Sequence, residues 1–256
     1  MANVLVCVKR VPDLGGEITL ADDSMSIDTS YIGHTVSPHE ECAVELAIQS
    51  AKATDGEATV LSLGTADSTE QIRDALAVGC TGAVLIEAEA EQFGPADVAR
   101  AIAEVVRAHE QDGRSYDMIL LGNDAADTGD FQVGIRLAYA LGRPVVAGVS
   151  SIELVDDHVV ARAAGADGTD IFEVELPAVL TVMEGGIEPR YPSIPGRMKA
   201  KRVTVETVTP SFQPAGSGRV RLKMPPPQPS QVNILGEGPE AAAVVVDLFE
   251  RLGVSK

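Results

Sequence analysis

Residues 117–134, DMILLGNDAADTGDFQVG, decide the fold class of this chain. The continuous apolar run 118–121 is typical of a short parallel strand that is buried on both faces. We expect a helix from about residue 131 to residue 142 after it, because four residues suited to a helix N-cap come first: Asp127, Thr128, Gly129 and Asp130. This stretch therefore predicts a strand, a loop and a helix, the repeating unit of an α/β fold.

The loop inside this stretch is a candidate ligand site. A helix that follows a strand directs free backbone N–H groups and the positive end of its dipole to the edge of the sheet, where an anion is favoured. The simpler interpretation is an ordinary strand-to-helix turn. However, this loop has about eight residues, and such turns usually have up to about six. It is neither a P-loop nor a G-x-G-x-x-G motif.

Composition excludes several classes of function. The chain has 256 residues, of which 45% are hydrophobic, and a formal charge of −18, which argues against binding to nucleic acid or anionic membranes. Three separated cysteines and four scattered histidines suggest neither a disulfide framework nor a metal site. No apolar run reaches the roughly 18 residues of a membrane span, so we expect no membrane insertion and a cytoplasmic location.

Strand and helix patterns alternate through the first half of the chain. The expected strands are 4–8, 58–63, 83–86 and 118–121, and the expected helices are 38–51, 68–78, 94–109 and 131–142. This order predicts a doubly wound, mostly parallel sheet. Ligands in such sheets bind at the carboxyl ends of the strands, where the strand order reverses. The ends after Val8, Leu63 and Leu121 should therefore form the walls of one pocket.

The helix expected from Pro38 has a strong start signal. Ser37 fits the N-cap, Pro38 fits the first helical position, and Glu40 completes a capping box. Before this helix, we expect Pro12 to end regular pairing and residues 13–36 to be irregular, with a small hairpin at Asp22-Asp23. The start of this helix is a second candidate contact for an anion or a ribose.

The second half of the chain changes its pattern. Segments 145–154, 158–163 and 171–176 are separated by turn signals and predict an antiparallel addition to the sheet. A buried strand is expected at 178–183, and 199–208 is expected to be a strand. Between them, 184–198 contains three prolines and three glycines and cannot be one regular element throughout.

The last part of the chain predicts an extended arm. Residues 209–231 are rich in proline and glycine, and an amphipathic helix follows at 240–252. We expect an α/β domain at 1–208 and a C-terminal arm and helix at 209–256 that contact a partner at least as readily as their own domain.

Four motifs occur in this order: VLVCVKRVPD, SPHEECAVELA, ILLGNDAADTGDFQVG and EPRYPSIPGRMKAKR. Over about residues 1–208 the chain resembles the β subunits of the electron transfer flavoproteins, and the last motif is the most specific. The resemblance implies an adenine-nucleotide α-hydrolase-like fold and a heterodimer with an α subunit that holds the redox FAD. It also implies a structural AMP in this subunit and an electron carrier without catalytic residues, which accepts electrons from a flavin dehydrogenase of the acyl-CoA dehydrogenase type and passes them towards a quinone oxidoreductase.

The resemblance also implies site residues. For the nucleotide they are Cys7, Ser37, Pro38, His39, Glu40, Leu63, Gly122, Asn123, Asp124, Ala125, Asp127, Asp130, Phe131, Gln132 and Val133. A loop near Ile194 resembles the loop that anchors the partner dehydrogenase, and Arg197, Lys199 and Arg202 would steer acidic partner surfaces. The C-terminal arm would contact the α subunit.

The chain departs from the family pattern at three places. It has Asn123-Asp124 where many members have Lys-Gln, Asp127-Thr128-Gly129-Asp130 where others have Asp-Gly-Asp-Thr, and Leu14 where an aromatic residue commonly approaches the flavin. An electron-bifurcating β subunit with a second FAD in place of AMP is an alternative, which residues 132–134 favour. An adenine-nucleotide-binding regulatory protein is an alternative from another class.

Overall fold

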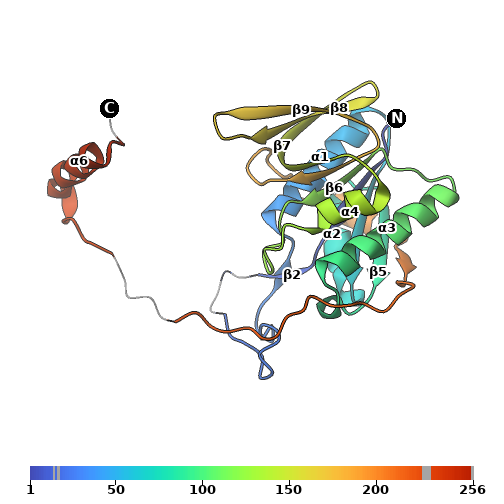
Figure 1. Cartoon of the computed structure of the whole chain (residues 1–256), viewed down its shortest axis with the longest axis horizontal. Coiled ribbons are helices and arrows are strands. Elements are labelled where there is room, and N and C mark those ends of the chain that lie inside the picture. The colour runs from blue at the N-terminus through green and yellow to red at the C-terminus, as the bar shows by residue number, and fades with distance from the viewer. Residues whose placement is uncertain (14, 16–17, 227–231, 255–256) are drawn as a thin grey trace. The chain divides into compact units, whose positions relative to one another are not determined.

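The parallel half of the sheet is organised around the first strand. In a computed structural model that describes residues 1–13, 15, 18–226 and 232–254, β1 (Val4–Val8) pairs in parallel with β4 (Ala58–Gly64) and with β6 (Met118–Gly122). Among these residues nine strands form one sheet in the order β11-β5-β4-β1-β6-β10-β7-β8-β9 (Figure 1). The strand order reverses between β1 and β6, so the predicted doubly wound sheet and the adjacency of β1, β4 and β6 are confirmed.

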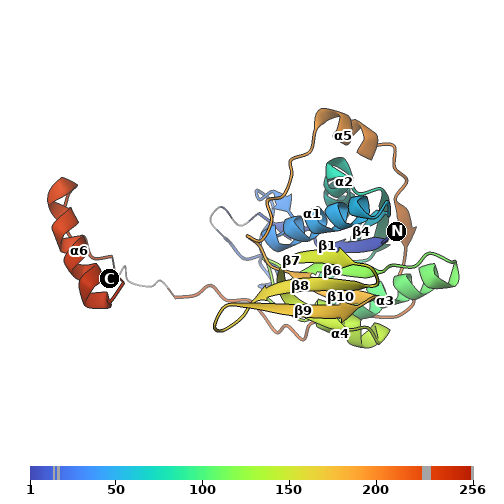
Figure 2. The same cartoon turned by 90° about the horizontal axis from the view of Figure 1, so that it is seen from above.

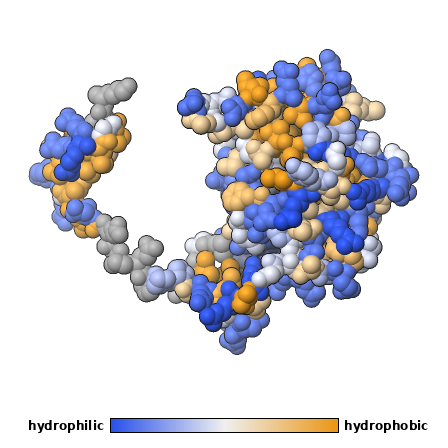
Figure 3. Space-filling view, in the orientation of Figure 1, coloured by the Kyte–Doolittle hydropathy of each residue, from blue (hydrophilic) through white to orange (hydrophobic). Residues whose placement is uncertain are grey.

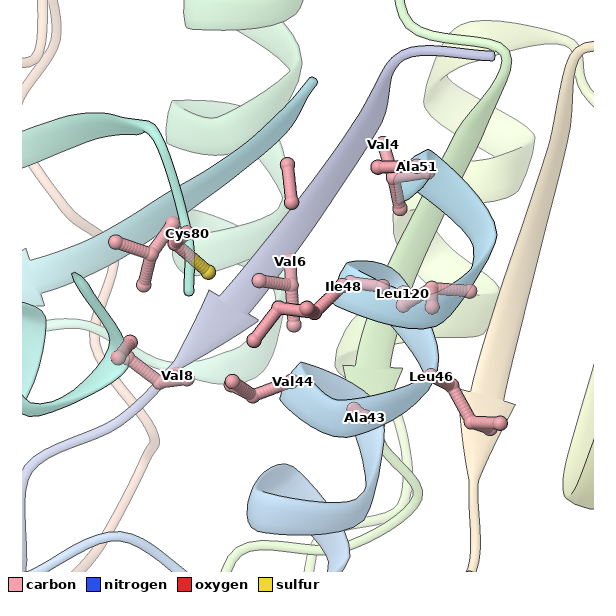
Figure 4. Packing of buried hydrophobic residues seen from close by; sticks show 14 of the residues in the cluster. Val4, Val6, Val8, Ala43, Val44, Leu46, Ile48, Ala51, Cys80 and Leu120 are labelled. Atoms are coloured by element: carbon pink, nitrogen blue, oxygen red, sulfur yellow. The ribbon is translucent and has the colours of Figure 1, made fainter. Parts of the chain in front are cut away.

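Helices cover both faces of the parallel strands. α1 (Pro38–Ala53) and α2 (Thr69–Val78) lie on one face, and α3 (Pro95–Gln111) and α4 (Val133–Leu141) lie on the other (Figure 2). Figure 4 shows three valines of β1 directed at α1, with Val6 towards Ile48, Val8 towards Val44 and Val4 beside Ala51. Every residue of β1 is buried, as a strand between two helical layers requires.

The remaining elements of the parallel part are short. β5 (Gly82–Glu87) pairs with β4, and β10 (Ala178–Val182) pairs in parallel with both β6 and β7. Single 3₁₀ turns occupy Ala66–Ser68, Ala90–Gln92 and Gly238–Glu240.

The predicted antiparallel addition is confirmed. β7 (Val145–Val155), β8 (His158–Ala164) and β9 (Thr169–Glu175) form consecutive antiparallel hairpins. The first hairpin turns at Asp156, whose backbone has a positive φ of 51°. An aspartate tolerates this left-handed conformation better than most residues, which explains why the Asp-Asp turn signal was reliable.

Three local expectations were wrong. Strand pairing does end at Pro12, the last residue of β2 (Val11–Pro12), but residues 13–36 are not irregular throughout, because β3 (His34–Thr35) forms a small antiparallel sheet with β2. α4 begins at Val133 with Gln132 as its N-cap, so none of the four predicted capping residues caps it. Segment 199–208 is not one strand, because α5 (Ile194–Ala200) extends into it and only β11 (Glu206–Val208) pairs with β5. The expected hairpin is present as a bridge between Leu20 and Ile27.

The contacts divide the chain into two units, Met1–Leu222 and Lys223–Lys256. Residues 209–222 belong to the first unit, because Phe212 packs edge-on against Phe93 and the backbone N–H groups of Ala215 and Gly216 donate to Asp97. The second unit contains α6 (Ala241–Leu252), whose surface carries both hydrophobic and hydrophilic side chains (Figure 3). In the described part of the chain, no helix has the length and apolar character needed to span a membrane.

Candidate functional site

The carboxyl ends of β1, β4 and β6 and the start of α1 meet at one edge of the sheet. Gly122 ends β6, and a Cβ added there would lie 2.7 Å from Cγ of Glu40 and 3.2 Å from its backbone nitrogen. The absence of a side chain at Gly122 therefore allows α1 to begin directly against the end of β6. This contact joins the two segments that sequence reasoning nominated separately.

Glu40 fixes the start of α1 to the end of β1. Its carboxylate accepts hydrogen bonds from the backbone N–H of Ser37 (3.0 Å) and of Lys9 (2.9 Å), while its side chain is almost fully buried. Burial raises the pKa of the Glu40 carboxyl to about 8, although both N–H donors and the charge of Lys9 favour the ionised form. The capping box predicted from Ser37 and Glu40 is confirmed.

The loop after β6 is held from both sides. The backbone N–H of Asn123 donates to the carbonyl oxygen of Val182 (2.8 Å), and the hydroxyl of Thr181 donates to the side-chain oxygen of Asn123 (2.6 Å). The hydroxyl of Ser37 donates to the carbonyl oxygen of Asp124 (3.2 Å). One carboxylate oxygen of Asp124, Oδ1, is buried and has no hydrogen-bond partner among the described residues. This oxygen can accept a hydrogen bond from a ligand hydroxyl or amino group.

Lys9 bridges two of the converging loops. Its Nζ lies 2.8 Å and 2.7 Å from the two carboxylate oxygens of Asp127, with the two side chains 35% and 20% exposed. The ion pair joins the end of β1 to the middle of the β6–α4 loop and offsets one of the loop's negative charges. Asp127, which begins the segment that departs from the family pattern, is thus paired within this chain.

The backbone is strained just before the start of α4. Phe131 has a positive φ of 51°, a conformation that costs a non-glycine residue about 1–2 kcal/mol. Its ring is exposed, and the side chain of the following residue, Gln132, accepts hydrogen bonds from Arg136. The first backbone N–H groups of α4, from Val133 onwards, have no partner within the helix, which is the general condition for anion binding at a helix start.

The structure brings most of the expected nucleotide residues to this edge. The face of the sheet covered by α3 and α4 buries Cys7 and Leu63. The start of α1 contains Ser37, Pro38, His39 and Glu40. The other expected residues lie at the end of β6 or follow it in the chain. Nδ1 of His39 accepts from the backbone N–H of Glu184, so this side chain fastens the segment after β10. Asp130 is exposed. Leu14 lies outside the described residues.

Sequence reasoning missed Lys9 and Thr181 as supports of this site. Lys9 could have been found from its place directly after a buried strand, and Thr181 from its place as a polar residue inside the apolar run 178–182. Their contacts join residues 118 and 58 positions apart, which no local pattern predicts. Among the described residues, no group of three or more histidine, cysteine, aspartate or glutamate side chains is arranged to hold a metal ion.

The nominated partner-recognition residues lie elsewhere, on and after α5. Ile194 starts this helix and is 78% exposed, Arg197 and Lys199 lie in it, and Arg202 follows it. The expected loop around Ile194 is therefore a short helix, capped by the hydroxyl of Ser193, which accepts from the N–H of Gly196. α5 lies outside α2 (Figure 2), away from the strand ends that form the other site.

A family model and similar known proteins both indicate the same protein family for this chain. A family model described as an electron transfer flavoprotein domain matches residues 24–213. An electron transfer flavoprotein subunit beta from Syntrophomonas wolfei is 33% identical over 244 residues, covering 94% of this chain and 92% of the relative. Subunits of the same name from Bacillus subtilis and Homo sapiens are 32% and 34% identical, covering 80% and 81% of this chain and 77% and 81% of their own lengths. The relatives named here are β subunits, and the chain belongs to the electron transfer flavoprotein family.

Proposed function

We propose that this chain is the β subunit of a heterodimeric electron transfer flavoprotein with a structural AMP in this subunit and the redox FAD held mainly by the α subunit. In this role it accepts electrons from a flavin dehydrogenase of the acyl-CoA dehydrogenase type and passes them towards a quinone oxidoreductase. Family membership supports the electron-transfer role, and the names of the relatives support an α-subunit partner.

The observation that carries the AMP proposal is the unpartnered oxygen of Asp124. This carboxylate oxygen is buried and has no donor within the described part of the chain, so it fits a ribose hydroxyl or an adenine amino group. Cys7 and Leu63 offer small apolar surface for the base, and the N–H groups at the start of α4 suit the phosphate. The Lys9–Asp127 pair limits the repulsion between this acidic loop and a phosphate. When bound, AMP would supply no redox chemistry, and these residues would bind and orient it.

The test is a count of released nucleotides. The heterodimer is purified, denatured, and its supernatant is separated by chromatography to quantify flavin and adenine nucleotides. One FAD and one AMP per heterodimer are expected. Two FAD and no AMP would replace this proposal with the electron-bifurcating alternative. A colourless homo-oligomer that retains an adenine nucleotide and does not assemble with an α subunit would favour the regulatory alternative.

A further inference from the structure

Residues 184–205 make a long crossover outside the helices. They leave the sheet at the end of β10 and return at β11, so they pass from one side of the parallel strands to the opposite edge. Figure 2 shows α5 outside the layer formed by α1 and α2. Tyr191, Ile194 and Met198 are 92%, 78% and 58% exposed, so this crossover presents three large apolar side chains to solvent.

The first fastening of the crossover is an ion pair to α1. The guanidinium of Arg190 donates from Nε and Nη2 to the two carboxylate oxygens of Glu45 at 2.6 Å and 2.5 Å, and Gln49 donates to the same carboxylate at 2.7 Å. The Glu45 side chain is only 5% exposed. Burial alone would raise the pKa of Glu45, but the hydrogen bonds from Arg190 and Gln49 outweigh it and lower the pKa. This two-point pairing fixes the direction of the chain four residues before the start of α5 at Ile194.

The second fastening is to α2. Nη1 of Arg73 donates to the carbonyl oxygens of Ala200 and Val203, the latter at 2.6 Å, and so satisfies carbonyl groups at the end of α5. A Cβ added at Gly196 would lie 2.2 Å from the carbonyl oxygen of Ala77, so the backbone of α5 touches the backbone of α2. Ala200 is buried in the core beside α2.

We propose that Glu45, Arg190 and Arg73 are positioning residues for partner docking, because they hold the crossover on α1 and α2 and present Tyr191, Ile194 and Met198 as a preformed apolar surface. Without these contacts a segment rich in proline and glycine would have to be ordered during each encounter with the partner. Preorganisation removes that cost from the binding step and leaves the electron-transfer step unchanged. The inference rests on the proposed function, with a dehydrogenase as electron donor, and on the resemblance of the segment near Ile194 to the loop that anchors such a partner.

The test uses the αβ heterodimer as the substrate of an acyl-CoA dehydrogenase from the same organism. Arg190→Gln should raise the KM for the heterodimer about tenfold with kcat changed less than twofold, and Arg190→Lys, which keeps the charge, should raise it less. Arg162→Gln is the matched control, because it removes a partly exposed arginine that lies 3.8 Å from Glu153 on the antiparallel hairpins. The control should leave KM unchanged, and FAD content should be equal in all variants.

A second arm separates positioning from general stability. If Arg190 acts by presenting Ile194, then Arg190→Gln should raise KM less than twofold once Ile194→Ala is already in place. If the two substitutions raise KM independently, so that their effects multiply in the double variant, the inference is wrong. It is also wrong if Arg190→Gln leaves KM normal while Ile194→Ala raises it. A normal KM for Ile194→Ala alone would also overturn the inference, because α5 would then not be the docking surface, while the released FAD and AMP would still test the proposed function separately. If Arg190→Gln lowers FAD content, Arg73→Gln replaces it in the same comparisons.

Discussion

At the scale of single residues, Glu40 combines burial with two hydrogen bonds from backbone N–H groups. Its pKa in the folded state is about 8, above the value of 4.5 expected for an unfolded chain. The folded state therefore binds more protons than the unfolded state between these two pH values, and Glu40 destabilises the fold as pH rises through this window.

Glu40→Gln replaces the carboxyl with an amide that does not titrate, so the unfolding free energies of the unmodified chain and of this variant can be compared at each pH. The free energy of unfolding of the unmodified chain, relative to this variant, should fall by on the order of 4 kcal/mol between pH 4.5 and pH 8. Urea unfolding at several pH values measures this difference, and other titrating groups cancel in it. A difference that stays constant over the window would show that folding does not raise the pKa of Glu40.

A second residue-scale prediction concerns the Lys9–Asp127 pair. Lys9→Met leaves the Asp127 carboxylate unpaired beside the proposed phosphate position, so AMP binding to a nucleotide-free heterodimer should weaken about tenfold. Asp127→Asn added to Lys9→Met should restore most of the affinity, because it removes the unpaired charge. Calorimetric titration with AMP measures both. If the double variant binds as weakly as the single one, Lys9 itself contacts the phosphate and the pairing argument is wrong.

Local residue chemistry was predictable from the sequence, and distant pairing was not. The capping box at Ser37 and Glu40 lies within four residues and follows from one helical turn. The contacts of Lys9 with Asp127 and of Arg190 with Glu45 span 118 and 145 residues, and they exist only because the fold brings these distant segments together.

At the scale of elements, the buried strands and the long helices were predictable because their apolar patterns are strong. The segment 199–208 was not, since its strand-like composition was overridden by Arg73, which binds the end of α5, and by the pairing of only three residues with β5. α4 likewise begins later than expected, because Phe131 adopts a left-handed conformation that no capping rule anticipates.

Residues 209–222 provide an element-scale prediction. The carboxylate of Asp97, near the start of α3, accepts from the N–H groups of Gly94, Ala215 and Gly216 at 3.0, 3.0 and 2.8 Å. Asp97→Asn replaces one acceptor oxygen with an amide that cannot accept, so amide hydrogen exchange over residues 211–219 should accelerate about tenfold or more. Glu91→Gln, a change at an exposed position near the same helix, should leave that exchange unchanged. Equal exchange in Asp97→Asn would mean that other contacts hold this segment.

At the scale of the whole molecule, the division after Leu222 refines the expected role of the C-terminal arm. Sequence composition marked a change at residue 209, because proline and glycine become frequent there. The contacts assign 209–222 to the first unit instead, through Asp97, through Phe212, and through the N–H of Leu222, which donates to the carbonyl oxygen of Ser24 at 2.7 Å. The proline and glycine content of a segment indicates how its backbone behaves, but it does not predict which surface the segment packs against.

Two truncations distinguish these contributions. Removal of residues 223–256 should leave the thermal unfolding midpoint within about 3 °C of that of the full chain, because those residues form a separate unit. The same truncation should weaken assembly with the α subunit at least tenfold if α6 contacts that partner. Removal of residues 209–256 should also lower the midpoint, since it exposes the surface of α3 that Phe212 covers. Differential scanning calorimetry and sedimentation of mixtures with the α subunit measure the two effects. Unchanged assembly after the shorter truncation would assign the interface to the first unit alone, and the exposed apolar side chains of α6, such as Phe249 and Leu252, would then need another explanation.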